Sequence, residues 1–197
     1  RWGRGHETYG EDPYLTGKLG CAYIRGLQGP DRDHPKAAAC AKHFAVHSGP
    51  EALRHEFDAK VSRHDLYDTY LYAFKRCVKD AGVEAVMGAY NRVNGEPACG
   101  SRTLLKNILR DEFGFEGHVV SDCWAINDFH LHHHVTGIAE ESAAMAVNNG
   151  CDLNCGNAFL HLPKAYEMGL VSEEAITEAV ERLMEIRIRL GMMEDYP

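Results

Sequence analysis

The sequence lacks both a long apolar run and an excess of basic residues. No stretch of its 197 residues approaches about eighteen consecutive apolar side chains, the length at which a membrane-spanning helix becomes a candidate. The formal net charge is −8, whereas nucleic-acid-binding domains are usually basic, with lysine and arginine clustered on one face. We therefore expect neither a membrane span nor a nucleic-acid partner.

Nucleotide-binding loops and a leader segment are also missing. Neither a G-x-G-x-x-G turn nor a P-loop follows any apolar segment, although an open parallel sheet that binds nucleotides usually carries one. The chain starts RWGRG, without an initiator methionine or a charged-then-apolar leader. We expect no signal peptide within this chain, and this leaves open whether the parent polypeptide carries one.

Cysteine occurs seven times, but no two cysteines form a C-x-x-C pair. An odd number of widely spaced cysteines argues against a disulfide framework, so we expect most of them to be small buried apolar residues. Cys151 and Cys155 are four residues apart, but a zinc site would need two further ligands at suitable positions. The sequence thus favours neither a disulfide framework nor zinc, and it leaves the redox compartment open.

Short apolar segments alternate with amphipathic ones along the chain. Four segments predict buried strands that are covered on both faces: residues 37–46, 83–90, 117–122 and 150–154. Helical periodicity and capping residues predict helices at 13–28, 62–82, 101–114, 138–149 and 172–191. Their predicted apolar faces include Leu66, Tyr70, Ala73, Phe74, Cys77, Leu104, Leu105, Ile108, Leu109, Ile176, Val180 and Leu183.

Alternating strands and helices predict an α/β fold with a parallel sheet, either an open doubly wound sheet or a (β/α)8 barrel. Polar residues decide between them, because KH, AYN, SD and DLN lie in or at the ends of the four strand segments. Side chains at the carboxyl ends of successive strands converge on one mouth, where barrel enzymes have their active sites. A whole barrel needs roughly 250 residues. We therefore predict the later part of a (β/α)8 TIM-like barrel, incomplete in this chain.

Asp122 is the strongest candidate for chemistry, because a carboxylate directly after a buried strand is costly unless pairing or function retains it. The alternative is that Asp122 caps a following helix. Lys42 and His43 lie in an otherwise apolar strand. Neighbouring strand residues point to opposite faces, so both reach one ligand only if the strand bends or ends there. Lys42 amid apolar neighbours needs an acceptor, such as a carboxylate or a sugar hydroxyl.

Two arginines and a histidine cluster are weaker candidates. Arg4 lies in a glycine-containing loop and could instead pair with Glu7 or Glu11, and Arg54 could be a solvated loop charge. His132–His134 are consecutive, so their side chains diverge. Zinc ligands are usually spaced two to five residues apart. We therefore expect a solvated or partly packed loop here rather than a metal site.

Four blocks of the sequence resemble those of family-three glycoside hydrolases. They are RWGRGHETYGEDPYLTG, AKHFAVHSGPE with RHEF, MGAYNRVNGEP and GFEGHVVSDCWAI, and AVERLMEIRIRLGMMED is similar to the helix that closes the barrel domain of that family. SDC, DLNCG and HSGPE look more like the β-xylosidase and α-arabinofuranosidase branch, whereas many β-glucosidases of the family have SDW. Here Trp124 follows Cys123, so the motif has features of both groups.

The resemblance implies a role for each matching residue. Asp122 corresponds to the catalytic nucleophile. Arg4, Lys42, His43 and Arg54 correspond to groups that hydrogen-bond the sugar, and Met87 and Tyr90 to the wall of that subsite. The implied reaction is hydrolysis of terminal non-reducing β-linked sugars, β-xylosides above all, through a covalent glycosyl-Asp intermediate, with no metal and no organic cofactor. Lys42 or Arg54 near Asp122 would favour its ionised form.

The resemblance also implies that this chain is part of a larger enzyme. Residues 1–197 correspond to the C-terminal portion of an N-terminal (β/α)8 catalytic domain, and the acid/base usually belongs to a following domain. Glu7 and Glu51 are better interpreted as partners of Arg4 and Arg54 than as that acid. The alternatives are a β-glucosidase of the same family, an inactive sugar-binding fragment and a zinc hydrolase built on the histidine cluster. A periplasmic or extracellular location is favoured over a cytoplasmic one without being decided.

Overall fold

The structure is a computed structural model that describes residues 5–47 and 49–194. Its centre is a parallel sheet in the order β1-β3-β6, formed by β1 (Cys40–Phe44), β3 (Ala85–Gly88) and β6 (His118–Ser121). The sheet continues at Leu153, which forms a parallel bridge with Val120. All four predicted strand segments therefore take part in one sheet, although the fourth contributes a single bridge.

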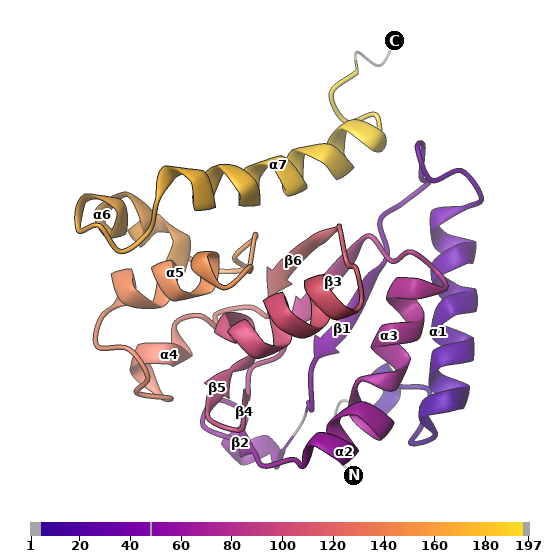
Figure 1. The fold of residues 1–197 in the computed structure, drawn as a ribbon, viewed down its shortest axis with the longest axis horizontal. Helices are drawn as coiled ribbons and strands as arrows, with labels where there is room; N and C mark the ends of the chain where they lie inside the picture. Colours follow the sequence, from indigo (N-terminus) through magenta and orange to yellow (C-terminus); the bar gives the residue numbers. More distant parts are fainter. Residues whose placement is uncertain (1–4, 48, 195–197) are drawn as a thin grey trace.

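Helices cover this sheet (Figure 1). Helix α1 (Pro13–Gln28) packs against α3 (Tyr72–Lys79) beside β1, and α7 (Glu173–Arg189) runs across the amino-terminal end of β6. No helix in the described part of the chain is both long enough and apolar enough to cross a membrane. The remaining helical elements are η1 (Gly5–Glu7), η2 (Glu51–Leu53), α2 (Arg63–Asp65), η3 (Leu66–Tyr70), η4 (Ala98–Gly100), η5 (Thr103–Glu112), α4 (Asp128–Leu131), α5 (Ala139–Asn148), η6 (Ala158–His161) and α6 (Leu162–Glu167).

Capping residues fix the helix ends where the sequence predicts them. The Asp12 carboxylate accepts hydrogen bonds from the backbone N–H groups of Tyr14 and Leu15 at the start of α1. Hydroxyls of Ser62, Ser101 and Ser172 cap the helical segments that follow them in the same way. The residues Gly82, Gly114 and Gly150 follow helical segments with positive φ angles, which a residue without Cβ adopts most readily.

Two residues that the sequence places on apolar helix faces are exposed, so these two predictions are wrong. Tyr70 is 42% exposed, because residues 66–70 form a π-helical turn that changes the helical phase and buries Leu71 instead. Val180 is 48% exposed, and the buried positions of α7 are Ala179 and Ile186.

A small second sheet was not predicted. Its order is β2-β4-β5, with β2 (Asp58–Ala59), β4 (Arg92–Val93) and β5 (Glu96–Pro97). Asn94 and Gly95 connect β4 to β5 with φ angles of 51° and 96°, the combination that a tight two-residue hairpin turn requires. This sheet lies beyond the carboxyl end of β3, so it shapes the side of the molecule where the candidate site lies (Figure 1).

A buried ion-pair cluster fixes α7 to the sheet. Asp152 is 4% exposed, and its carboxylate lies 2.8 Å from Arg110 Nη2 and 2.9 Å from Arg182 Nη1. It also accepts a 2.8 Å hydrogen bond from the Val119 backbone N–H in β6. Burial raises the pKa of the Asp152 carboxyl, and the two arginines oppose that shift. Asp152, which the sequence places among the residues of the mouth, is therefore a structural anchor.

We expect Asp152→Asn to destabilise the barrel by about 3–5 kcal/mol, because it leaves two partly buried arginines without their anion. Thermal unfolding of the polypeptide that contains this chain measures the loss. The matched control is Glu167→Ala, which breaks an exposed pair with Lys164 and should cost at most about 1 kcal/mol. Equal effects of the two variants would contradict the anchoring role of Asp152.

Candidate active site

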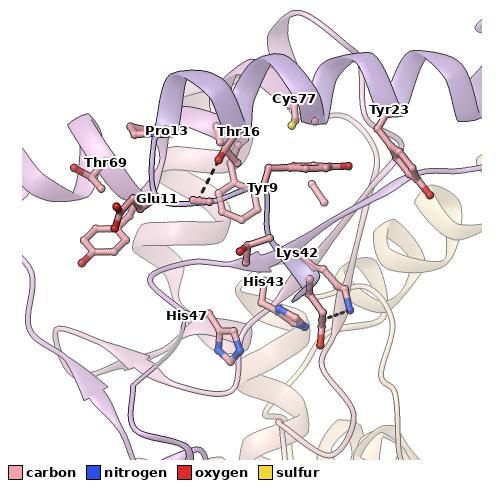
Figure 2. A pocket seen from close by; sticks show the side chains of 18 of the residues that line it. Tyr9, Glu11, Pro13, Thr16, Tyr23, Lys42, His43, His47, Thr69 and Cys77 are labelled. Carbon is pink, nitrogen blue, oxygen red and sulfur yellow. Dashed lines mark hydrogen bonds and ion pairs between the residues drawn. The ribbon is translucent and has the colours of Figure 1, made fainter. Parts of the chain in front are cut away.

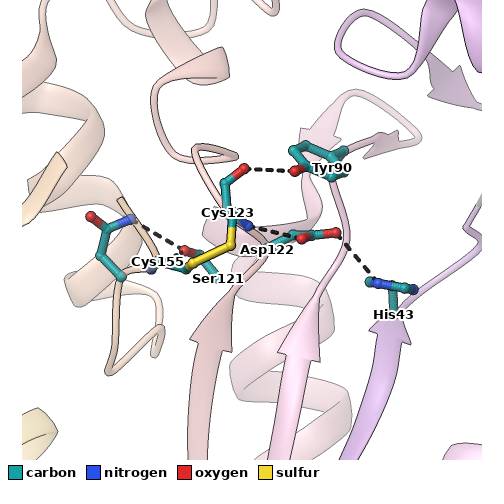
Figure 3. The surroundings of a disulfide bond; sticks show 7 residues. His43, Tyr90, Ser121, Asp122, Cys123 and Cys155 are labelled. Carbon is teal, nitrogen blue, oxygen red and sulfur yellow. Dashed lines mark hydrogen bonds and ion pairs between the residues drawn. A yellow bond between two sulfur atoms is a disulfide. The ribbon is translucent and has the colours of Figure 1, made fainter. Parts of the chain in front are cut away.

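The candidate site lies at the carboxyl ends of the parallel strands. Lys42 and His43 are in the last part of β1, Tyr90 is two residues after β3, and Asp122 directly follows β6. Because β1, β3 and β6 are parallel and adjacent, these ends meet at one edge of the sheet. Figure 3 shows His43, Tyr90 and Asp122 converging there.

Asp122 is held in place from its own loop and from the neighbouring strand. It is 7% exposed, and its backbone N–H donates to the Gly88 carbonyl at 3.2 Å. Oδ1 accepts a 2.8 Å hydrogen bond from the Cys123 N–H, while Oδ2 lies 3.4 Å from His43 Nε2. The next helix, α4, begins only at Asp128, so the alternative role of Asp122 as a helix cap is wrong.

Lys42 and His43 both contribute to the same cavity, which has a volume of about 740 Å³. The register between β1 and β3 shifts between Lys42 and Phe44, so the strict alternation of side chains is broken there. The cavity lies between β1, α1 and α3, and Figure 2 shows both side chains at its edge. Asp122 is not among the described residues that line this cavity, whereas Lys42 and His43 are.

The acceptor that the sequence predicts for Lys42 is the carboxylate of Glu7. Its Nζ lies 2.9 Å from Glu7 Oε2, with the two side chains 41% and 26% exposed. The predicted pairing of Glu7 with Arg4 stays a prediction, because Arg4 lies outside the described residues. The Glu7 carboxylate is thus engaged as the ion-pair partner of Lys42.

Tyr90 and Met87 come from β3 and the residues after it, next to the strand that ends at Asp122. The Tyr90 hydroxyl donates a 2.7 Å hydrogen bond to the carbonyl of Cys123, the residue after Asp122 (Figure 3). Met87 is half-buried in the middle of β3, paired in register with Lys42 on one side and Val120 on the other. Tyr90 thus contacts the loop that carries Asp122 directly. Met87 lies one residue before Gly88, whose carbonyl accepts a hydrogen bond from the Asp122 N–H.

Arg54 reaches the site through Tyr90. Its guanidinium carbon lies 5.7 Å from the centre of the Tyr90 ring, a distance at which a cation is attracted to an aromatic face. Arg54 also forms an ion pair with Glu51, as the sequence analysis expected. Glu51 is therefore engaged with a cation, as Glu7 is.

A disulfide joins Cys123 to Cys155, a single bridge that the sequence did not predict. Parallel pairing of β6 with the segment around Leu153 brings the two loops together, with Cα atoms 4.4 Å apart. The 32-residue separation between the two cysteines hid this proximity in the sequence. Cys21, Cys77, Cys99 and Cys151 are buried and free, as predicted, whereas the free Cys40 is exposed.

The histidines of the HLHHH segment contact different partners. His130 Nδ1 lies 2.9 Å from Ser142 Oγ, and His132 Nε2 lies 3.7 Å from Asp128 Oδ1. The ring of His133 stacks on Phe129, and burial lowers its pKa to about 4. Within residues 5–47 and 49–194, no three histidine, cysteine or acidic side chains are grouped so that they could hold a metal ion.

A contact between two loops at this mouth was not predicted from the sequence. His55 Nδ1 lies 2.8 Å from Asp128 Oδ2, across 73 residues of sequence. The only hint in the sequence is that each residue adjoins a candidate segment, RHEF or SDCWAIND. Pairing of two loops cannot be inferred from such adjacency.

Comparisons with known proteins agree with this geometry. The family model described as the Glycosyl hydrolase family 3 N terminal domain matches residues 1–186. Xylan 1,4-beta-xylosidase of Xylanibacter ruminicola is 51% identical over 99% of the chain and 23% of its own length. Beta-xylosidase/alpha-L-arabinofuranosidase 1 of Medicago sativa subsp. varia is 41% identical over 100% of the chain and 26% of its own length.

Solved structures show the same fold. The GH3 exo-beta-xylosidase XlnD, in complex with a xylobiose aziridine probe, superposes with a TM-score of 0.94 at 35% identity, over 100% of this chain and 27% of that chain. A beta-glucosidase from Listeria innocua in complex with isofagomine gives 0.89 at 34% identity, over 98% and 28%. The chain therefore spans about a quarter of the length of these relatives. The prediction of a partial TIM-like barrel is confirmed.

Mass spectrometry tests the cross-link beside Asp122. No lysine or arginine lies between Arg110 and Lys164, so trypsin should release Cys123, Cys151 and Cys155 in one peptide. We expect that peptide to take up one alkyl group, on Cys151, when the denatured protein is alkylated without reduction, and one on every cysteine after reduction. Complete labelling without prior reduction would contradict the disulfide.

Proposed function

The chain belongs to glycosyl hydrolase family 3, and from this premise we propose that its parent polypeptide is an exo-acting retaining β-glycosidase. It removes terminal non-reducing β-linked sugars, with β-xylosides as the favoured substrates. Residues 1–197 supply the later part of the N-terminal barrel domain, and the remainder of the polypeptide supplies the rest of the site. The substrate is a small oligosaccharide or glycoside.

The observation that carries this proposal is the position of Asp122. Its carboxylate lies at the end of β6, nearly buried, with one oxygen accepting a backbone N–H and the other facing His43. A retaining glycosidase needs a carboxylate in such a fixed position, because it must attack the anomeric carbon along a defined direction. The Cys123 N–H and the His43 imidazole fix the positions of the two carboxylate oxygens.

The other matching residues bind and orient the sugar. Lys42 and His43 donate hydrogen bonds to sugar hydroxyls near Asp122. Tyr90 and Met87 form the wall of the subsite. Arg54 packs against the Tyr90 ring. Arg4 belongs to the same proposed set, although it lies outside the described residues. These groups raise the rate by holding the anomeric carbon near the nucleophile.

The proton donor belongs to the remainder of the polypeptide. A retaining enzyme needs a second carboxyl group roughly 5–5.5 Å from the nucleophile. Glu7 forms an ion pair with Lys42 and Glu51 forms one with Arg54, so we interpret both as structural partners of these cations. An acid from a following domain completes the pair, as the family resemblance implies.

The names of the relatives support the substrate preference. Both relatives reported above are named xylosidases, and the name of the Medicago sativa protein also contains arabinofuranosidase. Solved structures of similar fold include both a xylosidase and glucosidases. Hydrolysis of β-glucosides is therefore the second candidate.

The disulfide supports a location outside the cytoplasm. Disulfides such as Cys123–Cys155 persist mainly in oxidising compartments. We place the protein in the periplasm or outside the cell for this reason.

Steady-state kinetics of the full-length polypeptide tests the proposal. We expect nitrophenyl β-xyloside to be hydrolysed with a higher kcat/KM than nitrophenyl β-glucoside or α-arabinofuranoside. Asp122→Ala should lower kcat by at least about three orders of magnitude, as is typical when a covalent nucleophile is removed. The control is Asp111→Ala, at an exposed aspartate of η5, which should retain full activity. Near-normal turnover by Asp122→Ala would refute the assignment.

A further inference from the structure

Two loops at the mouth of the site are joined by one buried carboxylate. Asp128, at the start of α4, has a side chain that is only 5% exposed, and its Oδ2 lies 2.8 Å from Nδ1 of the half-exposed His55. Its Oδ1 lies 3.7 Å from His132 Nε2, on the same helical segment. Burial raises the pKa of the Asp128 carboxyl, and His55 opposes that shift. Asp128 therefore holds the segment after η2 against the segment that follows the nucleophile.

The imidazole held in this way packs against Tyr90. The rings of His55 and Tyr90 meet edge to face, with centroids 5.1 Å apart and an interplanar angle of 75°. Bonding of Nδ1 to a carboxylate fixes both the tautomer and the orientation of an imidazole. The His55 ring is therefore a fixed wall on one side of Tyr90, not a freely rotating surface side chain.

Tyr90 transmits this contact to the nucleophile loop. Its hydroxyl donates to the Cys123 carbonyl at 2.7 Å, and the Cys123 N–H donates to Asp122 Oδ1 at 2.8 Å. The Cys123 residue thus receives a hydrogen bond from Tyr90 and gives one to Asp122. A displacement of the Tyr90 ring would change the geometry of the group that orients the attacking carboxylate.

We propose that His55, held by Asp128, is a positioning residue that fixes Tyr90 and, through Tyr90, the loop that carries Asp122. The inference rests on the proposed function, because it assigns His55 and Asp128 a part in the same reaction. A group that positions the nucleophile affects the transition state more than the bound ground state, so its loss lowers kcat more than it raises KM. A solely structural role would instead lower the amount of folded enzyme and leave the kinetic constants of the folded fraction unchanged.

The test uses the full-length polypeptide with nitrophenyl β-xyloside and two substitutions, one that removes the hydrogen bond between His55 and Asp128 and one that weakens it. His55→Phe keeps a ring against Tyr90 without a donor for Asp128, and Asp128→Asn keeps the shape of the buried side chain without its charge. Each should lower kcat about ten-fold, the effect of one lost hydrogen bond to a charged group, while KM changes less than about two-fold. The matched control is His64→Phe, which removes an exposed histidine 3.5 Å from Asp65 and should leave kcat and KM unchanged.

A double-mutant cycle tests whether the effect passes through Tyr90. In a Tyr90→Phe background, His55→Phe should cost less than about two-fold in kcat, because the hydroxyl contact that it supports is already gone. An undiminished ten-fold loss in that background would overturn the inference, and so would an unchanged kcat in the single variants. His55 is half-exposed, so His55→Phe remains informative if Asp128→Asn folds poorly.

A crystal structure of the His55→Phe variant gives a readout that needs no substrate. We expect the Tyr90 hydroxyl to move out of hydrogen-bonding distance of the Cys123 carbonyl, and an unchanged contact would overturn the inference. Failure of the wild-type polypeptide to hydrolyse any of the three glycosides would instead contradict the proposed function. The two ideas can therefore fail separately.

Discussion

The end of strand β6 is held from both sides, and the candidate nucleophile lies at that end. On one side, the Asp122 N–H donates to the Gly88 carbonyl of β3. On the other, the Ser121 N–H donates to the Leu153 carbonyl, and the buried Ser121 hydroxyl accepts the Cys155 N–H at 3.0 Å. The disulfide between Cys123 and Cys155 closes the same junction covalently (Figure 3). With both flanks fixed, the direction of the Asp122 side chain is set before any substrate binds.

The rest of the site follows from this fixed point. Parallel strands bring their carboxyl ends to one edge, so His43 and Tyr90 reach Asp122 from strands that are far apart in the sequence. Asp152 stabilises the same strand. It accepts the Val119 N–H of β6 and pairs with Arg110 of η5 and Arg182 of α7. Two carboxylates near β6 therefore have different roles: Asp152 is neutralised by arginines, and Asp122 faces an imidazole at the mouth.

Local rules predicted much of this structure from the sequence. Capping residues and periodicity located five helical segments but missed α4, η6 and α6. Polar residues in or after apolar runs pointed to Asp122, His43 and Tyr90, which the fold brings to one edge of the sheet. The failures were of two kinds. A π-helical turn shifted the phase at Tyr70, which a strict helical period cannot represent. The Cys123–Cys155 bridge and the His55–Asp128 pair join loops that are distant in sequence, and only the tertiary fold brings such loops together.

The central claim is that Asp122 is the group that attacks the sugar. A mechanism-based fluoro-xyloside tests it most directly, because a retaining enzyme forms a long-lived covalent adduct with such a compound on its nucleophile. After reaction with the full-length polypeptide, proteolysis and tandem mass spectrometry locate the attached sugar. The account predicts one label, on Asp122. A label on any other residue would contradict it.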